Sequence, residues 1–232
     1  MELDIFIKGE LINLCIPTAD FILESNWYNW FNNPRTTRFL YQGVFPNTRA
    51  DQLGFFEIEK KNKTRLILII SDKKKYIGTV SLSFIDFEKK TASVAIVIGE
   101  QSDNFSQSHL MALESIGRIT EHAFTTLGLK RIDSSQHILL YRWQQRLELL
   151  GYKLEGIKKN GFIKGNEIDD IVMLGVTLDD YMEIKKIRGK YWDTSDLMKF
   201  RVDKLPKKSF YQKLSELINI EGIRYYNDLF SL

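Results

Sequence analysis

The residues between positions 98 and 115 have the types and spacing of a phosphate-binding turn. Alternating apolar residues from Ala92 to Ile98 predict a strand that runs into Gly99, and an amphipathic helix follows from Ser108. A turn between a strand and a helix points free backbone N–H groups and the helix dipole at an anion. Such turns usually contain glycines, but positions 104–109 read Asn-Phe-Ser-Gln-Ser-His. Side chains at these positions can crowd an approaching phosphate.

Three side chains near the ends of predicted strands can transfer a proton. His137 ends a polar strand over 131–138, and His109 lies at a helix start, where the dipole favours the neutral imidazole. Glu100 directly follows a strand and can accept a proton through water. We take His137 and Glu100 as catalytic candidates, with a structural histidine and a solvated loop carboxylate as the alternatives. The polarity of 131–138 fits either a strand that lines a wet cleft or an edge strand.

Other kinds of site are not predicted. One Cys and three scattered His do not give the ligand spacing of a metal site. The sequence has no Ser-His-Asp signature, no Walker-type loop and no GxG spacing of a dinucleotide fold. The 33 basic residues nearly balance the 30 acidic ones, which argues against a nucleic-acid partner for the whole chain.

The length of 232 residues and the hydrophobic content of 44% predict one core plus an appendage. Cys15 is the single cysteine, so no internal disulfide can form and a reducing compartment is expected. Charged residues interrupt the early apolar run, and no stretch approaches the roughly 20 apolar residues of a membrane helix. We therefore expect a cytoplasmic protein that does not enter a membrane.

The elements that must position these residues follow from periodicity and turn signals. We expect a strand over 9–17, a helix from about 18 to 30, and a second helix over 48–61 that starts with a capping box at Thr48 and Asp51. Three antiparallel strands (65–71, 76–85 and 91–98) follow, then a helix over 108–127. The strand over 131–138 should lie parallel to 91–98 because a helix connects the two. A helix over 139–150 and a hairpin of 152–163 with 171–177 complete the pattern.

Four short motifs in this order resemble the GNAT acyltransferase superfamily. They are WFNNP (30–34), YIGTVSL (76–82), ITEHAFTTLGLKRID (119–133) and LGYKLEG (150–156). The motif over 119–133 resembles the helix end and strand start of the ribosomal-protein and amino-sugar acetyltransferases, and LGYKLEG is similar to a signature of the family. The resemblance implies a mixed α/β sheet flanked by helices over residues 1–180, with a helical C-terminal extension over 181–232.

The resemblance also implies a reaction and the residues that serve it. The family moves an acyl group from acetyl-CoA, used as co-substrate, to a small-molecule primary amine, and the first motif favours an amino sugar nucleotide as acceptor. The positions implied for the coenzyme are Ile98, Gly99, Asn104, Ser106, Gln107, Ser108 and His109. Those expected to contact the acceptor are Trp27, Trp30, Asn32, Thr79 and Ser81, for which core packing and a solvated sheet face are the alternatives.

Departures from the family pattern leave a second function open. The three defined positions of the family's pyrophosphate loop fall on Asn104, Gln107 and His109, and none of them matches. Leu140 and Leu147 occupy the places of an Asn and of a Tyr thought to protonate the leaving thiolate. The alternative to an N-acyltransferase is therefore a catalytically inactive binding or structural module of the same fold.

The C-terminal extension carries apolar residues with helical spacing between 192 and 218. From 185 to 213 it also has ten Lys or Arg against three Asp, which we interpret as a solvated face. The apolar residues predict that the segment either covers the domain or joins two subunits. We expect a homo-oligomer.

Overall fold

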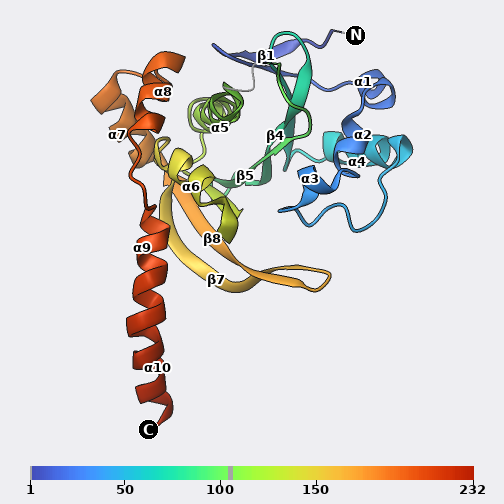
Figure 1. Ribbon diagram of the computed structural model, residues 1–232. Helices are drawn as coiled ribbons and strands as arrows, with labels where there is room; N and C mark the ends of the chain where they lie inside the picture. Colours follow the sequence, from blue (N-terminus) through green and yellow to red (C-terminus); the bar gives the residue numbers. More distant parts are fainter. Residues whose placement is uncertain (1, 104–106) are drawn as a thin grey trace.

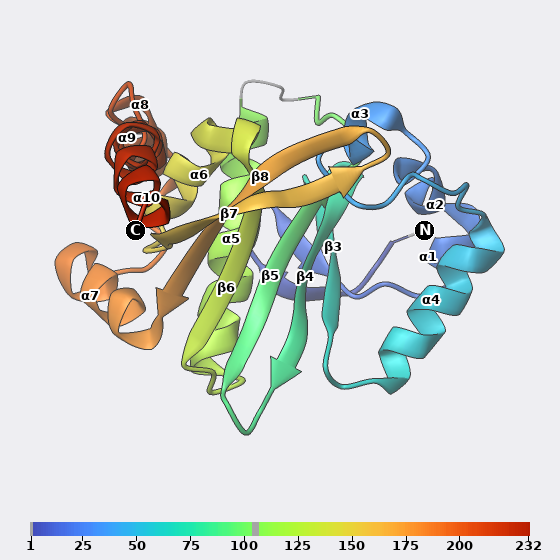
Figure 2. The ribbon, with the colours of Figure 1, turned by 90° about the horizontal axis from the view of Figure 1, so that it is seen from below.

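The computed structural model describes residues 2–103 and 107–232, and its centre is one mixed sheet between helices (Figures 1 and 2). The strand order is β1-β2-β3-β4-β5-β6-β8-β7, and among the described residues only β5 and β6 pair in parallel. The predicted mixed α/β fold is confirmed. The strands are β1 (Ile5–Lys8), β2 (Asn13–Cys15), β3 (Leu66–Ser71), β4 (Tyr76–Asp86), β5 (Thr91–Ile98), β6 (Arg131–His137), β7 (Lys153–Lys164) and β8 (Glu167–Thr177).

Alternation along β3 assigns the two faces of the sheet to two hydrophobic cores. Leu68 and Ile70 belong to the main core, which includes the apolar side of α5 (Ser108–Thr125). Ile69 belongs to a smaller core with Trp27 and Trp30. The helices on that side are α1 (Ala19–Glu24), α2 (Trp27–Trp30), α3 (Pro34–Thr37) and α4 (Arg49–Lys61).

The N-terminal region differs from the prediction in two places. The strand expected over 9–17 is a hairpin, because Gly9 donates its N–H to the carbonyl of Ile12 and turns the chain between β1 and β2. The helix expected to reach position 30 is interrupted at Ser25, whose extended backbone ends α1 before α2 begins. The capping box of Thr48 and Asp51 at the start of α4 is confirmed.

The parallel pair of β5 and β6 opens towards its carboxyl ends. The two strands pair only where Thr91, Ala92 and Ser93 meet Arg131, Ile132 and Asp133. Beyond this point β5 stays with β4, while β6 stays with β8 along its whole length. The edge-strand alternative for 131–138 is wrong, because β6 lies inside the sheet.

The C-terminal segment begins against the domain and ends away from it. α6 (Tyr141–Glu148) precedes the β7–β8 hairpin, and α7 (Leu178–Arg188) and α8 (Ser195–Asp203) follow it. α9 (Phe210–Leu217), a π-helical turn (Ile218–Gly222) and α10 (Ile223–Phe230) then form a rod that projects from the domain (Figure 1). No helix among the described residues is long and apolar enough to cross a membrane.

Candidate active site

A cavity of about 210 Å³ lies where β5 and β6 separate. Residues 94–98 of β5 form one wall, and the end of β6 with Leu140 and Trp143 forms another. Thr36, Phe39 and Leu40, which follow one another closely after α3 begins, complete the lining. None of these lining side chains is an acid, a lysine or an arginine, so the cavity itself suits an uncharged group.

The β5 edge that faces this cavity has no partner strand from Val94 onward in the described part of the chain. β6 forms ladder hydrogen bonds with β5 only as far as Ser93. From Val94 onward an extended ligand with amide groups can form such bonds with β5 instead. The polar end of β6 contributes Ser135, Gln136 and His137 to the opposite wall. The prediction that this polar strand lines a cleft is confirmed.

The start of α5 carries the described part of the predicted phosphate-binding turn. The hydroxyl of Ser108 is buried and has no hydrogen-bond partner among the described residues. Burial lowers the pKa of the neighbouring His109, and the positive charges of Arg146 and Lys199 lower it further, against the effect of Asp203. The N-terminus of α5 is thus bordered by basic side chains. Asn104 and Ser106 lie outside the described residues.

Packing and a hydrogen bond bring together three predicted residues that lie far apart in the sequence. A Cβ atom at Gly99 would come 2.1 Å from Cγ of Trp30, so only glycine lets the indole pack here. The indole Nε1 of Trp30 donates to Oε1 of Glu100 over 3.1 Å. Trp30 is 3% exposed, so it holds Glu100 in place instead of contacting an acceptor.

Four other residues expected to contact the acceptor have structural surroundings, as in the core-packing alternative. Trp27 is 1% exposed and belongs to the smaller core. The side chain of Asn32 exchanges two hydrogen bonds with the backbone of Asn47, which braces the loop after α3. Thr79 and Ser81 pair with Val97 and Ala95 and lie beside them on β4, but they do not line the cavity.

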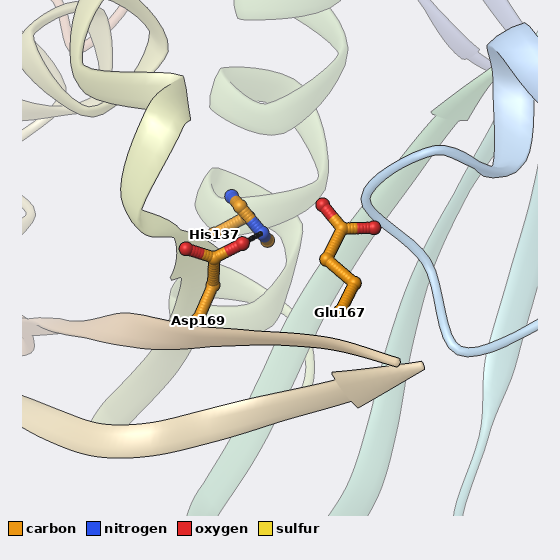
Figure 3. Close-up of side chains that lie close together, drawn as sticks. All are labelled: His137, Glu167 and Asp169. Atoms are coloured by element: carbon orange, nitrogen blue, oxygen red, sulfur yellow. Dashed lines mark ion pairs between the residues drawn. The ribbon is translucent and has the colours of Figure 1, made fainter. Parts of the chain in front are cut away.

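His137 has two partners that the sequence analysis missed (Figure 3). Its fully buried imidazole lies between the rings of Phe39 and Phe162, at centroid distances of 4.5 and 4.7 Å. The Nε2 atom is 3.4 Å from Oδ2 of Asp169, and Glu167 points to the same place from the start of β8. The sequence predicts only that residues 164–169 connect the two strands of a hairpin. Periodicity does not show which part of the sheet the connection lies next to.

The hydrogen bond at the other imidazole nitrogen defines the chemistry of this cluster. Nδ1 of His137 accepts the backbone N–H of Leu139 over 3.2 Å, so the neutral ring carries its proton on Nε2. Donor atoms of His137, Glu167 and Asp169 lie within 4.8 Å of one another, as a metal site requires. However, a ligating histidine normally donates its second N–H, and here that nitrogen accepts. The arrangement fits an N–H group that faces two carboxylates better than it fits a metal ligand.

The β7–β8 hairpin is fastened over this end of the cavity (Figure 2). The ammonium of Lys164 donates to the backbone carbonyls of Thr37, Leu40 and Gln42 over 2.7 to 3.0 Å. The hydroxyl of Tyr41 donates to the carbonyl of Gly161. These bonds join the hairpin to the segment after α3, which carries Phe39 and Leu40 of the cavity wall. These contacts of the hairpin tip therefore fix the positions of Glu167 and Asp169 relative to the cavity.

A family model described as an acetyltransferase (GNAT) domain matches residues 22–139, just over half of the chain. The chain belongs to the GNAT acetyltransferase family. The matched region of this GNAT domain runs from α1 to the short helix after β6 and so contains both cavity strands. No curated protein sequence matches the chain.

Solved structures with the same fold share little sequence with this GNAT chain. A spermidine N-acetyltransferase from Vibrio cholerae, in complex with CoA and spermine, is 17% identical with a TM-score of 0.66, covering 74% of this chain and 98% of that one. The microcin C7 self-immunity acetyltransferase MccE, in complex with acetyl-CoA and AMP, is 24% identical with a TM-score of 0.59, covering 73% and 94%. A GCN5-related N-acetyltransferase from Brucella melitensis is 18% identical with a TM-score of 0.62, covering 80% and 84%. At these identities the likeness concerns the fold.

Proposed function

We propose that this protein transfers the acetyl group of acetyl-CoA to a primary amine. The observation that carries the proposal is the opening between β5 and β6, with an unpaired strand edge beside an uncharged cavity. The two amides of the pantetheine arm suit that edge, and the cavity suits the acetyl group. The N-terminus of α5, the Ser108 hydroxyl and the positive charges of Arg146 and Lys199 would hold the pyrophosphate. Gln107 and His109 border the same helix start.

In the reaction the amine nitrogen attacks the thioester carbonyl carbon, the carbon–sulfur bond breaks, and the thiolate leaves as the amide forms. The nitrogen loses one proton in this step, which passes to the thiolate directly or through solvent. An alkylammonium must first lose a proton, which requires a base near the cavity. Glu100, held by Trp30, is one candidate. The neutral ring of His137 carries its proton on Nε2, which lies 3.4 Å from Oδ2 of Asp169 without a hydrogen bond between the two, so the second candidate base is the Asp169 carboxylate.

No family tyrosine is present to protonate the leaving thiolate. Leu147 at the expected place is 1% exposed in the main core, and Leu140 lines the cavity. A thiolate can leave without a protein acid, because thiols are much stronger acids than alcohols; the cysteine thiol has a pKa of about 8.5. We therefore expect slower turnover than the family mechanism allows, instead of no turnover.

The acceptor that fits best is an amine with a second positive charge. Glu167 and Asp169 lie beside His137 of the cavity wall, Glu100 follows the β5 wall by two residues, and no lysine or arginine among the described residues lines the cavity. The Vibrio cholerae neighbour was solved in complex with spermine, which is an amine with more than one positive charge. An amino sugar nucleotide, favoured by the WFNNP motif, carries negative phosphates that these carboxylates would repel. The two acceptors are distinguished by direct comparison of kcat/KM.

The test begins with calorimetric titration of acetyl-CoA into the full chain. We expect measurable binding that is weaker than is usual for the family, since Gln107 and His109 carry larger side chains than the family pattern has at these two positions. Ser108→Pro should abolish it because proline removes a backbone donor, and Gln107→Gly should strengthen it if side chains obstruct the phosphate. No heat and no thermal shift with excess ligand would remove the enzyme proposal and favour the inactive-module alternative.

The base is assigned by two isosteric variants. Removal of a general base typically lowers the rate by about 10²–10⁴-fold. If Asp169 is the base, Asp169→Asn lowers kcat by that factor while acetyl-CoA binding is unchanged, and Glu100→Gln changes kcat much less. The reverse result assigns the base to Glu100. Equal activity of both variants and the natural chain would show that neither carboxylate takes the proton.

A further inference from the structure

The rod formed by α9, the π turn and α10 carries apolar side chains, and from Leu217 onward the described part of its own chain does not cover them. Tyr211 is buried against the domain, but every residue from Leu217 to Leu232 except the half-buried Gly222 is exposed. The exposed side chains include Leu217, Ile218, Ile223, Tyr226 and Phe230. Apolar surface of this extent on a projecting helix normally marks a contact with a partner.

The π turn keeps these apolar residues on one face. Phe210, Leu214 and Ile218 follow one another at spacings of four residues, which is about one α-helical turn. Ile223 comes five residues after Ile218, and these five residues span the π turn from Ile218 to Gly222. Since a π turn holds one more residue than an α turn, Ile223 returns to the same face. The stripe then continues through Tyr226 and Phe230, whose rings stack.

The sequence of the rod is self-complementary when two copies run antiparallel. A crossing near Ile220 places Phe210 opposite Phe230, Leu214 opposite Tyr226, and Ile218 opposite Gly222 and Ile223. The same register places Glu216 opposite Arg224 and brings Lys213 to within one residue of the position opposite Asp228. A parallel pair would instead place each charge against its own kind, which is destabilising.

Gly222 supports a close crossing at this point. Its φ of −66° is ordinary for a helix, and a Cβ atom would meet only a side-chain atom of Ile218, at 3.5 Å. Nothing in its own chain therefore requires glycine, although glycine costs about 1 kcal/mol in a helix interior relative to alanine. The missing side chain leaves room for an opposing residue, which in the antiparallel register is Ile218 of a second copy.

We propose that the rod pairs antiparallel with the rod of a second copy of this chain and forms a two-fold homodimer. A membrane surface fits less well, because the helix from Phe210 to Phe230 carries two basic residues against three acidic ones. Surface-binding helices are instead rich in Lys and Arg. The pairing is independent of the proposed acetyl transfer, since it uses no residue of the cavity.

Sedimentation velocity of the full chain over a range of micromolar concentrations tests the pairing. We expect a dimer, and Ile218→Glu should convert it to a monomer with an unchanged melting temperature in dilute solution. Ile187→Glu is the control, because Ile187 is 74% exposed on α7 outside the rod. A monomeric natural chain, or a dimer that survives Ile218→Glu, would overturn the proposal.

A charge exchange tests the antiparallel register separately. Glu216→Lys and Arg224→Glu should each weaken the dimer, because each places like charges opposite one another. The double variant should dimerise at least tenfold more tightly than either single variant, because the charge pair is restored with its signs exchanged. Failure of the double variant to recover would overturn this register. If the natural chain is monomeric and binds vesicles of phosphatidylserine and phosphatidylcholine, then the rod binds a lipid surface and not a second copy.

Discussion

The two parts of the C-terminal segment both carry large apolar side chains but have opposite surroundings. Residues 181–211 place Tyr181, Tyr191, Trp192, Met198 and Tyr211 in the main core, together with α5 and β8. Residues 217–232 place leucine, isoleucine, tyrosine and phenylalanine side chains in contact with solvent. Both parts are helical, but residues 181–211 carry nine Lys or Arg and residues 217–232 carry only Arg224. Apolar helical spacing therefore predicts that a helix packs on something, but it does not say which surface it covers.

The difference lies in whether the domain offers a matching surface. Gly117 on α5 leaves room for the ring of Trp192, whose Cε3 would be 3.3 Å from an added Cβ atom. The hydroxyl of Tyr191 donates to the carbonyl of Leu150, and Arg188 donates to that of Leu149. The carboxylate of Glu10 accepts the backbone N–H and the hydroxyl of Ser195 at the start of α8. Beyond Leu217 no described residue makes such a contact with the domain.

The largest expected effect comes from two truncations that divide the segment differently. A chain that ends after Asp180 loses the five large core side chains of residues 181–211 and should be insoluble or strongly destabilised. A chain that ends after Leu217 keeps them and should melt within a few degrees of the full chain while sedimenting as a monomer. Thermal unfolding and sedimentation are the measurements. A folded, monomeric protein ending at Asp180 with the full melting temperature would show that residues 181–211 are not part of the core.

The next effect compares one large side chain from each part. Trp192 is 3% exposed, so Trp192→Ala should lower the free energy of unfolding by about 3–5 kcal/mol. Phe230 is 79% exposed, so Phe230→Ala should change the stability of the monomer by less than about 0.5 kcal/mol. Urea unfolding at low protein concentration measures both. Similar losses in the two variants would contradict the difference in packing.

Much of the fold could be predicted because local patterns fix it. The alternation of β3 to β5, the capping box of α4 and the parallel placement of β6 all rest on signals within one or two elements. The interruption at Ser25 was missed because the aromatic residues from 21 to 31 were assigned to one helix, although Ser25 and Asn26 are residue types that favour helix ends. The division of residues 181–232 was missed because it depends on where α5 offers a groove.

The candidate site could be predicted only in part. Glu100, Gly99 and His137 were found from their places at strand ends, where parallel strands commonly hold ligands. Trp30 was expected to touch an acceptor, but its indole is a support for Glu100, because aromatic composition does not distinguish the two roles. Glu167 and Asp169 reach His137 only through the path of the hairpin, which is fixed by Lys164 and its three carbonyl partners.

The smallest expected effect is a pH dependence that distinguishes charges on α8 from charges on α10. Burial and the positive charges of Arg146 and Lys199 lower the pKa of His109 in the folded state. The unfolded chain therefore binds more protons as the pH falls through the ordinary histidine pKa of about 6.5, and stability falls with it. His109→Gln should make the melting temperature fall less between about pH 7.5 and 5.5. Lys199→Gln on α8 should have part of this effect, because it raises the pKa of His109 towards its ordinary value.

Arg224→Gln on α10 is the control and should leave the slope of the monomer unchanged, since the rod lies away from His109. If Arg224→Gln alters the slope as much as Lys199→Gln does, then the rod lies against the start of α5 in solution, and the two parts of the segment do not differ as described.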